Sequence, residues 1–146
     1  MIFDSTNLFS DEQAVTASAA STNLIDLGAP GTPPNSSVAL VRDIALGVPV
    51  PITVRVTTTF ATLTSLKVAI QTDGVVNFGS PVTVNETEAI AAASLVAGYE
   101  FTMNYIPKAN ERYLRLYYTV AGDDATAGKV TAGIVASRKE GKAGGV

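Results

Sequence analysis

The sequence predicts an all-β protein that forms a single domain over residues 1–146, with the architecture of a two-sheet β-sandwich. Apolar and polar residues alternate with a period of two in several segments, as they do in strands that bury one face. Turn residues separate these segments at regular intervals, and only one short stretch has helical character. The length of 146 residues allows one sizeable hydrophobic core. The alternation alone leaves both jelly-roll and immunoglobulin-like connections open.

Residues 1–21 are expected to form an extended N-terminal arm, because their apolar residues stand at isolated positions. A short strand is predicted at 23–27. The next segment, 28–37, contains three prolines and two glycines (GAPGTPPNSS). These residues oppose regular structure and are typical of an exposed loop.

Two central strands are predicted at 51–60 and around 66–71. In the first, one face carries apolar residues and Thr58: Ile52, Val54, Val56, Thr58 and Phe60. In the second, Leu66, Val68 and Ile70 alternate with polar residues. Asp73-Gly74 is then a turn signal, and a strand at 81–85 begins with proline, which suits the edge of a sheet. Residues 89–97 are either a two-turn helix that ends at Gly98 or a buried irregular stretch.

The C-terminal half is predicted to contain three more strands. The strand at 99–105 turns four large side chains to one side and ends before Pro107: Tyr99, Phe101, Met103 and Tyr105. The strand at 111–121 is the clearest, and its inward residues are Leu114, Leu116, Tyr118 and Val120. Residues 122–128 are expected to form a hairpin loop before the strand at 129–136, where Gly133 allows a neighbouring backbone to approach. The basic, glycine-rich residues 137–146 are predicted to form a mobile tail.

Composition excludes several classes of function. The chain has no cysteine and no histidine, so thiol nucleophiles, zinc–thiolate sites and histidine general bases are impossible. The net charge of −3 is opposite to the basic surface of a nucleic-acid-binding protein. Charged residues make up only 16% of the chain, against roughly 25% in typical domains, which favours a surface partly covered by neighbouring proteins.

No segment predicts export or membrane insertion. The N-terminus lacks the pattern of a signal peptide, and the longest apolar stretch, 90–98, is far shorter than the ~20 residues of a membrane helix. We therefore expect no membrane partner and a protein that stays in the cytoplasm unless it leaves inside a larger particle.

No candidate for catalysis or for metal or cofactor binding is convincing, so an enzyme is not expected. Residues 122–129 differ from a phosphate loop in spacing and lack its Ser or Thr. Asp123-Asp124 could contribute to a calcium site, but no third acidic ligand is near in sequence. The pairs Asp11-Glu12 and Glu86/Glu88 could be glycosidase carboxylates, yet nothing in the sequence places either opposite a partner.

Two groups of residues are candidates for contact with a partner protein or with another copy of the chain. Tyr113, Arg115 and Tyr117 form an outward aromatic–arginine row that could contact a protein, pack internally or stack on sugars. Phe3, Leu8 and Phe9 could anchor the arm on a partner, or fold back onto the sandwich. If the arm is the anchor, deleting residues 1–9 should abolish binding and leave the fold intact.

Five stretches of the sequence carry a family resemblance: MIFD…LFSDEQAVTA, SAASTNLIDLG, FATLTSL at 60–66, AGYEF at 97–101, and ERYLRLYYTVAG…ATAGKVTAGIV at 111–135. With them the chain resembles the small capsid cement (decoration) proteins of short-tailed double-stranded DNA bacteriophages. The resemblance implies a jelly-roll β-sandwich on the outer capsid surface of the virion, made in the host cytoplasm. It also implies a homodimer or homotrimer that straddles neighbouring major capsid proteins, with no cofactor and no catalytic residues.

Two other functions remain open. A carbohydrate-binding module would use the Tyr113–Tyr117 row and would bind glycans as an isolated protein. A tail or fibre adaptor of the virion would share the fold and the composition, and only its position and copy number would distinguish it.

Overall fold

A computed structural model describes residues 3–40, 48–105 and 111–136 of the chain. The predicted tail at 137–146 and the proline at 107 lie outside these residues. The elements follow one another in this order: η1 (Ser5–Asn7), β1 (Leu8–Ala14), β2 (Ala19–Ala20), β3 (Ile25–Asp26), β4 (Val50–Asp73), β5 (Val82–Glu86), β6 (Ile90–Ala91), η2 (Ala92–Ser94), β7 (Glu100–Tyr105) and β8 (Tyr113–Ile134).

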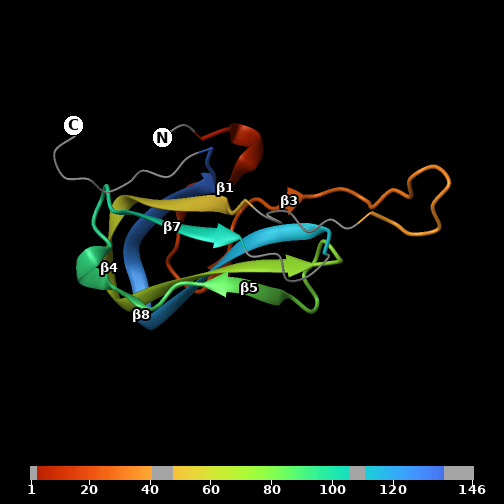
Figure 1. Cartoon of the computed structure of the whole chain (residues 1–146). Coiled ribbons are helices and arrows are strands. Elements are labelled where there is room, and N and C mark those ends of the chain that lie inside the picture. Colours follow the sequence, from red (N-terminus) through yellow and green to blue (C-terminus); the bar gives the residue numbers. More distant parts are fainter. Residues whose placement is uncertain (1–2, 41–47, 106–110, 137–146) are drawn as a thin grey trace, which may run out of the picture.

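The strands form one antiparallel sheet that folds over into two facing layers (Figure 1). β4 and β8 pair along nearly their whole lengths, and both strands pass through the bend. One layer contains β1, the C-terminal half of β8, the N-terminal half of β4, and β7. The other contains β2 and β3, the N-terminal half of β8, the C-terminal half of β4, and then β5 and β6. This order, four positions in each layer, is that of a jelly roll, so the all-β sandwich prediction is confirmed.

The bend replaces the predicted hairpin loop at 122–128, and that prediction is wrong. These residues belong to β8 and pair with the bend of β4, where Ala61 lies opposite Ala127 and Leu63 opposite Gly122. Register shifts between Val56 and Ser65 mark β-bulges, which curve a strand without ending it. Bulges therefore carry each long strand from one layer into the other.

The core lies between the layers and contains the inward faces expected from the alternation. The largest fully buried side chains include Tyr105, Tyr118, Phe9, Ile52, Leu66, Ile70, Leu95, Leu114 and Leu116. Thr58 was predicted to lie on the buried face of β4, and this prediction is wrong, because its side chain is exposed. The register shift between Val56 and Thr58 changes the phase of the alternation there.

The stretch at 89–97 contains no two-turn helix. It forms the two-residue strand β6 and the single 3₁₀ turn η2, and Leu95 is its buried residue. The strand β5, which follows Pro81, lies at the end of the strand order, as the proline predicted.

The N-terminal segment is extended, but it does not stand away from the sandwich. Its residues Leu8–Ala14 pair with β8 as the edge strand β1, and the Phe9 side chain is completely buried. The Ser10 hydroxyl is hydrogen-bonded to the Tyr118 hydroxyl at 2.7 Å. An added Cβ at Gly133 would lie 2.9 Å from the Asn7 carbonyl oxygen, so the predicted close approach at this glycine is confirmed.

Candidate interaction surfaces

The outward row on β8 is only partly available to a partner. Tyr113, Arg115 and Tyr117 alternate with the buried leucines of that strand and are half-buried. The Arg115 guanidinium lies 4.0 Å from the centre of the Phe78 ring and 5.6 Å from that of Tyr117. Its Nε donates to Gln71 Oε1 at 2.9 Å. Of the three alternatives of protein contact, internal packing and sugar stacking, Arg115 therefore shows internal packing. The accessible part of the row consists of the two tyrosine rings.

Phe78 was missed by sequence reasoning. It lies in the loop at 74–81 and is buried beneath Arg115, with a φ of 51° that is unusual for a residue with a side chain. The chain does turn at Asp73-Gly74, as predicted, but β4 and β5 are connected there by a longer loop rather than by a tight turn. No local signal identifies Phe78, because its partner lies on another strand.

The Asp73 carboxylate holds both ends of this loop. Its Oδ1 accepts a hydrogen bond from the Val75 N–H at 3.0 Å, and its Oδ2 accepts one from the Ser80 N–H at 2.9 Å. These backbone donors stabilise the ionised form and lower the pKa of Asp73 below its ordinary value. The loop is therefore closed by charge-assisted hydrogen bonds at its base.

A second carboxylate shapes the neighbouring loop, which begins after β3. Asp26 accepts two hydrogen bonds from Arg112, Nε to Oδ1 at 2.7 Å and Nη2 to Oδ2 at 2.6 Å. Its Oδ1 also accepts the Gly28 N–H at 2.8 Å. This bidentate pair links β3 to the segment that enters β8 and orients the chain where it leaves the sheet.

The three N-terminal candidate residues differ in how deeply they are buried. Phe9 is buried in the core, so its predicted role as an exposed anchor is wrong, because strand pairing of β1 with β8 turns this side chain inward. Phe3 and Leu8 are half-buried and pack over Gly133, within about 3 Å of the position that a Cβ would occupy there. The fold-back alternative therefore describes this segment, and the expected tolerance of a deletion of residues 1–9 no longer holds.

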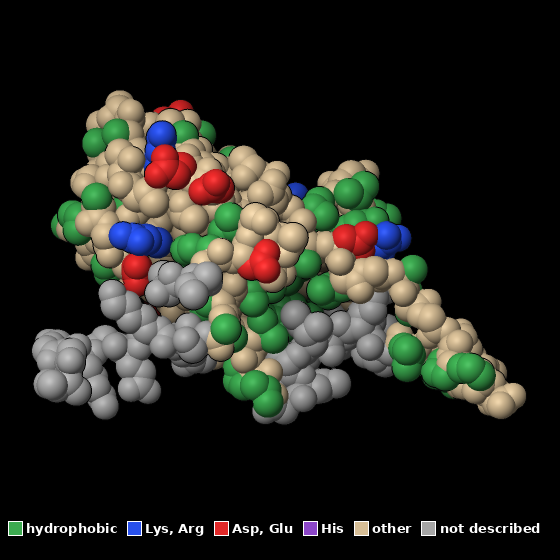
Figure 2. All heavy atoms as spheres, turned by 90° about the horizontal axis from the view of Figure 1, so that it is seen from above, with side chains coloured by type: hydrophobic (Ala, Val, Ile, Leu, Met, Phe, Trp, Pro, Cys, Tyr) green, Lys and Arg blue, Asp and Glu red, His purple; other side chains and the backbone are tan. Residues whose placement is uncertain are grey.

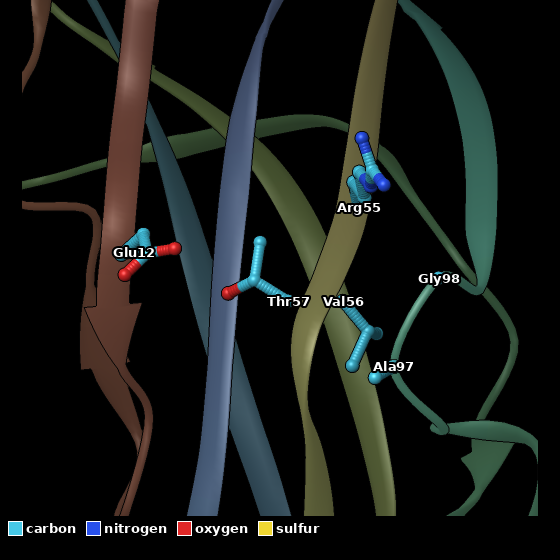
Figure 3. Close-up of a pocket in the computed structure, with 6 residues that line it drawn as sticks. All are labelled: Glu12, Arg55, Val56, Thr57, Ala97 and Gly98. Atoms are coloured by element: carbon cyan, nitrogen blue, oxygen red, sulfur yellow. The ribbon is translucent and has the colours of Figure 1, made fainter.

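A polar hollow of about 540 Å³ lies on the outer face of the layer that contains β1 and β7. It is lined by Glu12, Arg55, Val56, Thr57, Ala97 and Gly98. Figure 3 shows the Glu12 and Thr57 side chains extending toward each other across β8. The Thr57 hydroxyl is buried without a hydrogen-bond partner among the described residues. The Arg55 Nε lies 3.6 Å from Glu100 Oε1.

The hollow does not assemble the acid–base pair considered from the sequence. Its lining includes Glu12 but neither Glu86 nor Glu88, and Glu86 instead forms an ion pair with Lys67 at 3.1 Å. Asp123 and Asp124 are exposed on the bend of β8. In the described part of the chain, no three His, Cys, Asp or Glu side chains are grouped so that they could hold a metal ion. The described helical segments include none that is long and apolar enough to cross a membrane.

Comparison with protein families gives a match over most of the chain. The model of the protein family named Bbp16 matches residues 9–134, which covers all strands of the two layers except the first residue of β1. No curated protein matches the sequence significantly.

Proposed function

The chain belongs to the Bbp16 family, which is phage-related, and from this membership we propose that it is a structural protein of the virion. In the proposed role it binds the outer surface of the capsid and clamps neighbouring major capsid proteins. The shell is thereby stabilised against the pressure of the packaged DNA. The family match is the observation that carries the proposal, and the resemblance to capsid cement proteins supplies the specific role.

The fold supports a mechanical role through its two long strands. β4 and β8 each run through both layers, so the two layers are covalently continuous and share the strand pairing that passes through the bend. Side chains also close the two sides of the sandwich. Asn85 on β5 donates to the Asn104 carbonyl at 2.9 Å, and Gln13 on β1 donates to the Ala20 carbonyl at 2.9 Å. A clamp built in this way transmits load between its contacts without unfolding first.

The clamp acts through many copies. A shell under pressure opens at the seams between its subunits, and a protein bound on both sides of a seam must lose one contact before the seam opens. Each contact can be weak, because two linked contacts act at a high effective concentration. A symmetric dimer or trimer of this chain would match the local symmetry of such a shell.

The surface row gives less support to a sugar-binding function. The Arg115 side chain, at the centre of the row, is covered by Phe78 on one side and bonded to Gln71. A sugar platform would need an accessible aromatic surface with polar groups free to bond its hydroxyls. The capsid role is therefore the better-supported proposal.

Copy number in purified virions tests this proposal. Quantitative mass spectrometry should find hundreds of copies, in a fixed ratio to the major capsid protein. Capsids that lack the protein should also bind it when it is added, and should then withstand a higher temperature before they release DNA. A handful of copies per particle would contradict the cement role and favour a tail or fibre adaptor.

A further inference from the structure

The exposed apolar side chains of the described residues are concentrated at one end of the jelly roll. Eight large hydrophobic side chains are substantially exposed: Leu24, Val38, Leu40, Val48, Val75, Val76, Val82 and Val96. Val96 follows η2 near the bend, six of the others lie in or directly beside the two loops at the opposite end of the sandwich (Figure 1), and Val48 precedes β4. We call the loop at 28–40 the finger and the loop at 74–81 the valine loop. Isolated exposed apolar residues are ordinary, but this asymmetric distribution is not.

The register of the sheet places the two loops next to each other. Asp26 at the end of β3 lies opposite Tyr113 on β8, and Asp73 at the end of β4 lies opposite the same Tyr113. β3 and β4 are both antiparallel to β8, so they run in the same direction and end at the same level. The finger and the valine loop therefore leave the sheet in the same direction, with only β8 between them, about 10 Å apart.

Both loops are ordered at their bases and present apolar side chains at their outer parts. In the finger, the Leu40 N–H donates to the Gly31 carbonyl at 2.9 Å, and the exposed fractions of Val38 and Leu40 are 71% and 57%. In the valine loop, Asp73 binds both ends while Phe78 packs under Arg115. Val75 and Val76 consequently face solvent, with exposed fractions of 52% and 59%. An ordered loop loses less conformational entropy when it binds.

The chemistry of this end indicates an uncharged partner surface. Residues 27–41 and 74–85 contain no Asp, Glu, Lys or Arg. Figure 2 shows hydrophobic side chains, and no charged ones, on the finger that projects at the right. At the base of the loops, Asp26 pairs with Arg112, Asp73 bonds the loop backbone, and the Glu111 carboxylate lies beside Gly74. The two loops themselves carry no charged side chain, so salt bridges from the loops do not account for this surface.

A convex apolar projection needs a concave acceptor. Two hollows on the described surface each include a carboxylate: one is lined by Glu12 and Arg55 among others, and another, of about 460 Å³, is lined by Asp4, Asn7, Ile134, Val135 and Ala136. Burying an apolar finger in either would remove water from a carboxylate without replacing its hydrogen bonds. These two hollows are therefore poor acceptors, and we place the acceptor on a different protein, with the oligomeric state below as the test of a second copy.

We infer that the finger and the valine loop together form the docking surface of this protein, and that they insert into an uncharged apolar cleft on the capsid shell protein. This inference rests on the proposed capsid-binding function and assigns the residues that carry it. The bend, with its exposed Asp123 and Asp124, then faces away from the shell.

Matched aspartate substitutions test the assignment. Three variants of the full chain are compared with the wild type for binding to capsids that lack the protein: Val75→Asp/Val76→Asp in the valine loop, Val38→Asp/Leu40→Asp in the finger, and Val96→Asp as the control. Val96 has a similar exposed fraction, 48%, but lies near the bend. Circular dichroism first establishes that each variant is folded, and Val75→Ser/Val76→Ser replaces the aspartate pair if that variant is not.

Each loop variant should bind at least about tenfold more weakly than the wild type, and Val96→Asp should bind normally. Wild-type affinity should change little between 50 mM and 500 mM NaCl, because no charged side chain of the two loops takes part. If the wild type binds and all variants bind equally well, the docking assignment is wrong while the capsid role stands. If the wild type itself does not bind, the proposed function fails and the assignment fails with it.

Two further measurements separate the alternative partners. A loop variant whose oligomeric mass in sedimentation falls below that of the wild type would show that a second copy occupies this surface, which would overturn the inference. Flotation with phosphatidylcholine vesicles tests lipid as the partner. We expect that the wild-type protein does not float with the vesicles. If it floats and the loop variants do not, lipid is the partner of this surface and the inference is overturned.

Discussion

At Gly128 the backbone of β8 passes so close to the Phe60 ring of β4 that there is no room for a side chain. An added Cβ would overlap this ring, and the φ of 144° is itself unfavourable for other residues. At the other side of the bend, Gly122 has a φ of 87° and meets Thr64 in the same way. These two positions allow β8 to follow the curve of β4 through the bend.

Gly128→Ala should therefore lower the free energy of unfolding by about 2–4 kcal/mol, the combined cost of backbone strain and overpacking. Urea unfolding of the purified variant measures this loss. Gly31→Ala is the matched control, since its added Cβ would have no atom within 4 Å and its φ is not in the left-handed region. Equal stabilities of the two variants would contradict this account of the bend.

A single carboxylate also gives the valine loop a dependence on pH. Hydrogen bonds from Val75 and Ser80 lower the pKa of Asp73 in the folded state, whereas the unfolded value is about 3.9. The stabilisation is therefore complete above pH 4 to 5 and is lost as the pH falls through the folded pKa.

Asp73→Asn should be less stable than the wild type at pH 7, and this difference should shrink as the pH falls toward 3. Urea unfolding at several pH values measures the difference directly. A difference that stays constant over this range would show that the Asp73 charge does not stabilise the loop.

Among the elements, β1 and the finger contribute in opposite ways. β1 adds an edge strand to β8 and places Phe9 in the core, and its Ser10 bonds the buried Tyr118 hydroxyl. Burial raises the pKa of Tyr118, so this phenol stays protonated and able to share the hydrogen bond. None of residues 28–40 is buried, and the finger lies outside the core. The first element is expected to stabilise the fold, and the second to serve binding.

Phe9→Ala should lower the free energy of unfolding by about 3–5 kcal/mol, as expected for a large side chain removed from a packed core. Replacing residues 32–39 by Asn-Gly should change the stability by less than about 1 kcal/mol. The Leu40 N–H and Gly31 carbonyl are already hydrogen-bonded, so a two-residue turn can join these positions. Thermal and urea unfolding of both variants compare the two elements. A shortened finger that costs as much as Phe9→Ala would rule out its role as a peripheral binding loop.

At the scale of the whole molecule, the two layers are covalently continuous through β4 and β8. One hydrophobic core joins residues from both layers, including Phe9 and Val54 from one and Leu66 and Leu116 from the other. Neither layer has a separate set of strands or a separate core. The domain is therefore expected to unfold in one cooperative step.

Unfolding followed by far-ultraviolet circular dichroism and by tyrosine fluorescence should give the same midpoint and the same slope with urea. The tyrosines are suitable probes, because Tyr105 belongs to one layer and Tyr118 to the other. Distinct midpoints for the two signals would show that the layers unfold separately.

Local alternation predicted most of the strands and most of their buried faces, but it did not predict β1, the continuation of β8 through 122–128, or the exposure of Thr58. In β7 and the first half of β8, more buried and less buried side chains alternate, so the period of two in the sequence directly reports which face is inward. In β4 the alternation is interrupted by buried runs at 52–54 and 68–70. The candidate site was less predictable. The row at Tyr113, Arg115 and Tyr117 was located correctly, but Arg115 packs on Phe78, which lies in a loop far from the row in the sequence, and no local pattern encodes that contact.

The sequence by itself determined the all-β class, the inward face of the clearest strands and the uncharged, proline-rich character of the finger, because each depends on residues close together in the chain. The tertiary structure alone decided that residues 122–128 continue a strand and that Phe9 is buried. A run of glycine and acidic residues suits a loop and a bulged strand equally well, and pairing with the bend of β4 selects the second. Phe9 is likewise turned inward by pairing with β8, more than a hundred residues away, and a contact over that separation leaves no local period to read.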